Sequence, residues 1–206
     1  MKNFYSPLFV VLRIVVYALL LFGIAEAIFF DAAHPMEDGY FGEITLTEIG
    51  QELILFVLFV FYWLLSRKQP EIKAVSLLVS LFFLASFIRE FNFLVEHWVF
   101  LVLPVLAGFL WVLIKNVRKL EEQLQRFFSI PASSWLVAGV LVTFVFSRLF
   151  GRSKFWRLLY HDDTYRLAKA ATEEGIELLG NSLMLIGAIE FLLYFLYTKS
   201  TGNEKT

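Results

Sequence analysis

Residues 45–65, TLTEIGQELILFVLFVFYWLL, decide the fold. A run of about 20 mostly apolar residues is long enough to cross a bilayer core of roughly 30 Å as a helix. Glu48 and Glu52 lie in its first turns, four residues apart and therefore on one helix face. A charge that faces lipid at a helix centre is unfavourable by roughly 2.5–3.5 kcal/mol, so it needs a partner, water or a shallow position. The stretch therefore predicts a membrane span with acids at one end.

The composition extends this prediction to the whole chain. Of its 206 residues, 59% are hydrophobic and 18% are charged, whereas about 25% are charged in an average soluble domain. The net charge of −1 offers no basic field, so we expect no nucleic-acid partner. The sequence has no cysteine, which excludes disulfides, thiolate metal sites and cysteine nucleophiles. We predict an all-α, polytopic membrane bundle, with one domain over residues 1–198 and a flexible tail over 199–206.

We predict about six transmembrane helices from the apolar blocks. Residues 115–126 are interpreted as a charged connector, and Pro104 is expected to kink the fourth span. Apolar and basic residues near 152–161 are typical of a helix that lies at the membrane interface. The last helix could begin soon after this segment and exceed 30 residues. The predicted spans cover about residues 8–30, 45–65, 72–94, 98–115, 133–150 and 175–197.

Lysine and arginine in the loops predict the orientation. With the N-terminus inside, the inner segments hold ten of these residues and the outer segments hold seven, none of them in the first outer loop. We therefore expect the N- and C-termini in the cytoplasm, with a bacterial inner membrane as the location. Membrane lipids are the expected partners, together with other membrane subunits.

Alternating spans place most of the acids at one membrane face. Glu48 and Glu52 open the second span, Glu90 closes the third, and Glu174 and Glu177 open the sixth. Acid pairs three or four residues apart point from one helix face, as in carboxylate metal sites inside helical bundles. His97 and His161 are the histidine candidates at the same face. The predicted metal ligands are Glu48, Glu52, Glu90, Glu174, Glu177 and His161, for a divalent ion whose identity the sequence does not specify.

Structural interpretations of the same residues remain open. Thr45 to Glu48 fits a helix capping box, and Asp162 and Asp163 are natural N-caps. Arg89 and Glu90 could form an ion pair with Glu52 or Glu177. His97, which precedes a tryptophan, could equally be a headgroup-level anchor.

Two further charges lie at similar depth in different spans. Arg13 is about six residues from the inner end of the first span, and Glu190 is about seven residues from the inner end of the sixth. Because hydrocarbon penalises an isolated charge, we predict that these two residues form a structural pair.

Two functional hypotheses follow. In the first, the chain is a membrane enzyme with a carboxylate and histidine site at the outer interface, acting on a lipid-like or anionic substrate. Its catalytic residues are Glu52, Glu90, His97, His161 and Glu177, and Arg89, Arg148, Arg152 and Arg157 bind the substrate. In the second, the chain is non-enzymatic, either a cation or proton transporter or a packing subunit of a larger membrane complex. The acids then belong to an ion-pair network.

Overall fold

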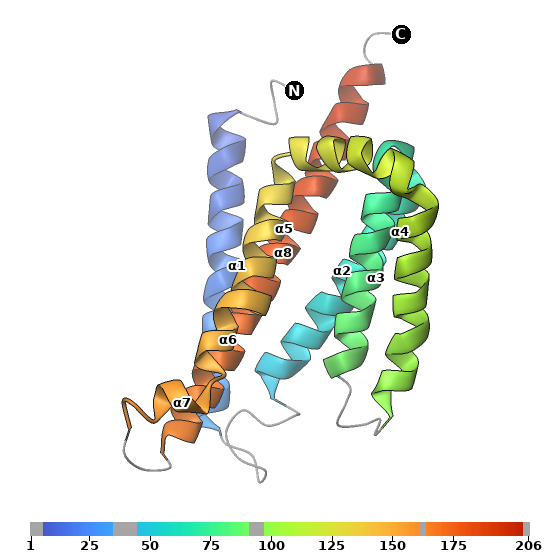
Figure 1. Ribbon diagram of the computed structural model, residues 1–206. Helices are drawn as coiled ribbons and strands as arrows, with labels where there is room; N and C mark the ends of the chain where they lie inside the picture. The colour runs from blue at the N-terminus through green and yellow to red at the C-terminus, as the bar shows by residue number, and fades with distance from the viewer. Residues whose placement is uncertain (1–5, 35–44, 91–96, 161–163, 204–206) are drawn as a thin grey trace. The chain divides into compact units, whose positions relative to one another are not determined.

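The computed structural model describes residues 6–34, 45–90, 97–160 and 164–203. These residues are almost entirely helical (Figure 1). Six helices among them are long and apolar enough to cross a membrane, which confirms the predicted all-α bundle. The helices are α1 (Pro7–Ala33), α2 (Leu46–Lys68), η1 (Pro70–Ile72), α3 (Lys73–Glu90), α4 (Trp98–Ser129), α5 (Ala132–Leu141), η3 (Val142–Phe146), α6 (Ser147–Phe150), α7 (Ser153–Trp156) and α8 (Tyr165–Asn203).

The chain forms two compact units, which are described separately. The first unit contains residues 1–50 and 135–206, and the second contains residues 51–134. The first unit is built on α8, against which α1, η3, α6 and α7 pack. Figure 1 shows α1, α5 and α8 running alongside one another. The predicted single domain over 1–198 stays a prediction.

The first unit relies on a close approach between α5 and α8. A Cβ atom added to Gly139 would lie 2.5 Å from the carbonyl oxygen of Gly180, and both glycines are buried. Two helices inside a membrane gain little from the hydrophobic effect, so small residues that allow close backbone contact stabilise their packing. Met184 and Phe191 on α8 are fully buried in the same unit.

The second unit packs α2, α3 and α4 around aromatic side chains. Tyr62 and Phe83 are fully buried, with ring centroids 5.8 Å apart, and Phe127 lies 6.4 Å from Tyr62. The Ser80 hydroxyl donates to the carbonyl oxygen of Phe59 at 3.0 Å and links α3 to α2. These contacts come from all three helices, so they fix the rotation of each helix about its axis.

Two predicted segments need correction, and a third contains a turn that was not predicted. The predicted connector over 115–126 is helical, because α4 continues to Ser129. The predicted interfacial helix near 152–161 is a single helical turn, Ser153–Trp156, followed by hydrogen-bonded turns up to Tyr160. The predicted fifth span contains a π-helical turn over Val142–Phe146. The prediction of a long last helix is confirmed, since α8 has 39 residues and reaches into the stretch predicted as a tail.

Candidate functional site

The strongest polar cluster of the first unit surrounds Glu177 on α8. Its side chain is only 10% exposed and pairs with the guanidinium of Arg148 on α6. The Ser147 hydroxyl lies 3.1 Å from the Glu177 carboxylate, and the Thr143 hydroxyl donates to the Glu177 backbone carbonyl at 3.3 Å. The cluster therefore joins α8 to the end of the fifth span through both the side chain and the backbone of one residue.

The local backbone explains why these groups meet. Gly180, one turn after Glu177, has no Cβ, and a Cβ there would overlap the Thr143 hydroxyl. The π-helical turn directly precedes Ser147, whose backbone N–H bonds to the carbonyl of Val142. A π turn inserts an extra residue and so shifts the face on which later residues lie, and such turns are frequent at functional sites. The prediction used only the apolar run of this span, which contains no sign of the turn.

In this cluster the charge of the Glu177 carboxylate is compensated by the charge of the Arg148 guanidinium. A guanidinium beside a carboxylate favours its ionised form and repels a metal cation. The hydroxyl of Ser147 also lies 2.5 Å from the Thr143 carbonyl, and its single hydrogen can serve only one of its two acceptors at a time. One turn from Glu177, Asn181 is 1% exposed, and its Oδ1 has no hydrogen-bond partner among the residues that the structure describes.

A second acid of this unit, Glu190, is bonded as predicted. One carboxylate oxygen accepts from Arg13 at 2.6 Å and the other from the Tyr17 hydroxyl at 2.5 Å. The side chains of Arg13 and Glu190 are each 13% exposed. The structure confirms the predicted pairing. Sequence reasoning missed Tyr17, although its position four residues after Arg13 places it on the same helix face.

A third acid, Asp31, also serves the backbone. Its carboxylate accepts from the N–H of Leu46 at 3.0 Å, and from the N–H and hydroxyl of Thr47 at 2.7 and 2.6 Å. These donors lie in the first turn of α2, where backbone N–H groups lack helical partners. The Thr45 hydroxyl accepts from the Glu48 N–H at 3.4 Å, as the predicted capping box requires. Asp31 directly follows the predicted first span over about 8–30, and nothing in its local sequence indicates this distant cap.

In the second unit, two of the predicted acids lie near each other. The negative charges of Glu52 on α2 and Glu90 on α3 interact electrostatically. Arg89, predicted to bind substrate, pairs with its neighbour Glu90 at 2.6 Å. Both members of that pair are partly exposed, at 39% and 26% of their side-chain surface. Arg89 therefore pairs with Glu90 itself, whereas the alternative of an ion pair with Glu52 or Glu177 stays a prediction.

The remaining predicted acids and histidines come from different parts of the chain. Glu48 lies in the first turn of α2 and Glu174 in the third turn of α8, and both side chains are half-buried. Glu173, beside Glu174, pairs with Lys169 at 3.1 Å. His97 is exposed and packs edge-on against a phenylalanine ring 5.9 Å away. His161 lies outside the described residues.

Two predicted substrate-binding arginines are exposed near α7. Arg152 precedes this turn, and Arg157 follows it. The Arg157 guanidinium lies 5.6 Å from the ring centre of Tyr165, an arrangement typical of a cation–π contact.

The prediction of a metal centre is not supported by this arrangement. Within the described part of the chain, no group of three or more histidine, aspartate or glutamate side chains could hold a metal ion. Glu177 and Arg148 are brought together, as are Glu52 and Glu90, but the first pair belongs to one unit and the second to the other. No protein-family model, no curated protein and no solved structure matches this chain.

Proposed function

We propose that the chain is a non-enzymatic integral membrane protein, a packing subunit whose intramembrane acids hold its own helices together. One observation carries this proposal: the Glu177 carboxylate, predicted as catalytic, is occupied by Arg148 and Ser147 of the same chain. A general base or an ion ligand needs lone pairs directed at the substrate or ion. Here one carboxylate oxygen, Oε1, pairs with Arg148 and lies 3.1 Å from the Ser147 hydroxyl, and both of these residues belong to α6.

The other acids of the first unit support the same interpretation. Glu190 and Asp31 each accept at least two hydrogen bonds from other segments of the chain. In both cases the acid joins α1 to another helix. The apolar surface of α1 supports contact with lipid or with other subunits, since Tyr17 and Asp31 are the only buried residues of this helix.

Stability measurements distinguish a structural acid from a functional one. Functional clusters of charge usually destabilise a fold, so neutralising them raises stability. We expect the opposite for Glu177→Gln and Arg148→Gln, each of which should lower the unfolding free energy by about 1.5–3 kcal/mol. The double variant should lose less than the sum of the two, because the two residues interact directly.

Divalent cations provide the matched control. A specifically bound ion stabilises the folded state by mass action and so raises the thermal midpoint. Under this proposal no ion binds specifically, so millimolar Mg²⁺, Mn²⁺, Ca²⁺ or Zn²⁺ should leave the thermal midpoint of the wild-type protein unchanged. An increase in stability for Glu177→Gln, or a cation-dependent increase in the wild-type midpoint that this variant abolishes, overturns the proposal.

A second candidate is the membrane enzyme acting on a lipid-like or anionic substrate. It is favoured by Glu52 and Glu90, which place two like charges near each other at the ends of α2 and α3. Such a pair holds a proton or a cation more readily than either acid alone. Elemental analysis of the purified protein tests it, with wild type compared to Glu52→Ala and Glu177→Ala. Stoichiometric metal in the wild type that is lost in Glu52→Ala supports this candidate.

We also propose a location in a bacterial inner membrane, with both termini in the cytoplasm. An even number of candidate spans supports two chain ends on the same side, and the excess of lysine and arginine in the segments assigned to that side supports the cytoplasm. Reporter fusions after residues 34, 69 and 130 test it. The first should be active outside the cytoplasm, and the other two inside.

A further inference from the structure

The second half of α4 has three distinct faces. Val117, Leu120, Leu124 and Phe128 follow one another at intervals of three or four residues, so they share one face of the helix. Lys115, Lys119, Glu122 and Arg126 follow the same spacing on the opposite face. This separation is typical of a helix that lies in a membrane interface.

The third face fastens this helix to its own unit. The Gln123 side chain accepts from the backbone N–H of Ala74 at 2.7 Å, at the beginning of α3. Arg126 pairs with Glu71 at 2.9 Å, and Phe127 is 1% exposed. The position of the helix is therefore set by protein contacts, which leave its apolar face uncovered within the second unit.

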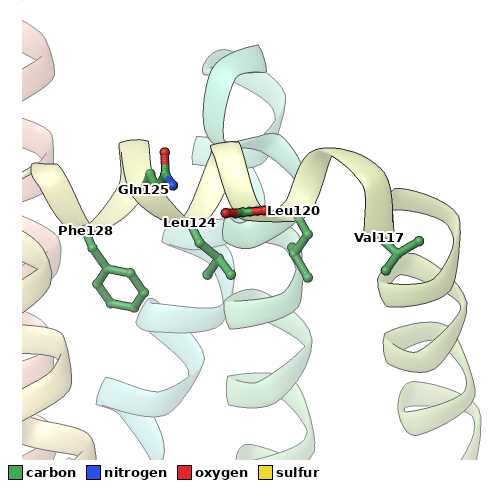
Figure 2. Close-up of a pocket in the computed structure, with 6 residues that line it drawn as sticks. Val117, Leu120, Leu124, Gln125 and Phe128 are labelled. Carbon is green, nitrogen blue, oxygen red and sulfur yellow. The ribbon is translucent and has the colours of Figure 1, made fainter.

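The apolar face forms a groove. Figure 2 shows Leu120, Leu124 and Phe128 projecting from the same side of the helix. The groove has a volume of about 620 Å³. Val117 and Phe128 are 63% and 54% exposed. The lining residues are Val117, Leu120, Glu121, Leu124, Gln125 and Phe128.

The position of this groove along α4 indicates that its ligand is a lipid. The helix bends near Val117 (Figures 1 and 2), and the apolar side chains beyond the bend project toward the side on which the spans of α3 and α4 run. Trp111, six residues before Val117, is 61% exposed, and the Lys115 amine lies 4.5 Å from its ring centre. Exposed tryptophan with a basic neighbour is typical of headgroup depth.

The charge of the segment indicates which lipid. Residues 115–126 contain four basic residues and two acidic ones. Arg126 is engaged by Glu71 and Glu122, and Lys115, Arg118 and Lys119 lie nearest to the bend. Basic residues on an amphipathic helix beside a span attract anionic headgroups. We propose that the groove binds an acyl chain of an anionic phospholipid of the adjacent leaflet, and that Arg118 and Lys119 bind its phosphate.

Site-directed spin labelling tests this proposal directly, because the chain has no native cysteine. Labels are placed singly at Leu124→Cys and Phe128→Cys in the groove, and at Glu122→Cys on the polar face of the helix as the matched control. In nanodiscs that contain phosphatidylglycerol, the groove labels should be accessible to oxygen and shielded from a water-soluble nickel complex. The control label should show the reverse.

Charge variants test the headgroup part. Replacing phosphatidylglycerol with phosphatidylcholine should move the Leu124→Cys label toward water, by at least a twofold change in its oxygen-to-nickel accessibility ratio. The double variant Arg118→Gln/Lys119→Gln should abolish this lipid dependence, whereas Arg152→Gln/Lys154→Gln, with the same loss of charge, should preserve it. Groove labels that are open to nickel overturn the proposal. Labels shielded from both reagents also overturn it, because they show a protein segment in the groove.

Discussion

The pair formed by Arg13 and Glu190 gives the most demanding test of the acids as structural elements. Both side chains are only 13% exposed and belong to helices that are long and apolar enough to cross a membrane, so a charge left without its partner is poorly solvated. Removing one partner of a buried ion pair usually lowers stability by about 3–5 kcal/mol. We expect Arg13→Leu to fall in that range. Arg13→Glu should reach or exceed its upper end, because the repulsion is added to the loss of the bond.

The Tyr17 hydroxyl separates the contributions within this cluster. It donates to the second oxygen of Glu190 at 2.5 Å. A hydrogen bond to a charged group contributes about 1.5–3 kcal/mol, which is the loss expected for Tyr17→Phe. The exchanged variant Arg13→Glu/Glu190→Arg restores the attraction but removes the acceptor of Tyr17. We therefore expect it to recover most of the loss of Arg13→Glu and to remain about 1.5–3 kcal/mol below wild type.

Reversible unfolding in mixed micelles, followed by circular dichroism, measures all four variants. Arg152→Glu provides the control for charge reversal, because Arg152 is exposed and its variant should match wild type. The reasoning is refuted if Arg13→Glu lies within about 0.5 kcal/mol of wild type, the range of ordinary surface substitutions. It is also refuted if the exchanged variant is no more stable than Arg13→Glu alone.

Three further predictions use the same unfolding assay. Asp31→Ala should lower stability by about 1–3 kcal/mol, because the first turn of α2 loses its acceptor; a loss below 0.5 kcal/mol contradicts this role. Gly180→Ala should lower the unfolding free energy by about 1–3 kcal/mol, because the added Cβ would overlap Thr143. The control is Gly108→Ala, where the added Cβ meets open space. It should leave the unfolding free energy unchanged or raise it by up to about 1 kcal/mol. Ser80→Ala should cost about 0.6 kcal/mol, a typical value for a hydrogen bond between membrane helices, and a loss above about 2 kcal/mol contradicts this estimate.

The features that could be predicted from the sequence are those that the hydrocarbon core of a bilayer requires. Long apolar runs must form spanning helices, because backbone groups in lipid need internal partners. The pairing of Arg13 with Glu190 follows from the same penalty: two opposite charges at one depth in different spans have few other partners. Depth can be counted along a sequence, so such pairs are accessible to prediction.

The parts that sequence did not predict depend on helix rotation. The Glu177 cluster requires the face of α6 that carries Ser147 to point at α8, and that face is set by a π-helical turn and by the contact between Gly139 and Gly180. An apolar helix in a bilayer lacks a polar side that would reveal its rotation from sequence. The bonds of Asp31 are missed for a related reason, since they join segments about 15 residues apart around a tertiary corner.

This difference affects how acids in membrane proteins are interpreted. A cluster of carboxylates indicates an active site only if the chain lacks the donors to occupy them. Here Glu177, Glu190 and Asp31 each have donors from neighbouring helices, and in two cases the donor is an arginine at the same depth. The Glu52 and Glu90 pair differs, because Arg89, which pairs with Glu90 in the described part of the chain, is partly exposed. If any acid of this chain binds a proton or an ion, we expect it to be Glu52 rather than Glu177, because Glu177 has donors from its own chain. The unfolding measurements on the Glu177 and Arg13 variants, together with the elemental analysis, distinguish a structural acid from one that binds an ion.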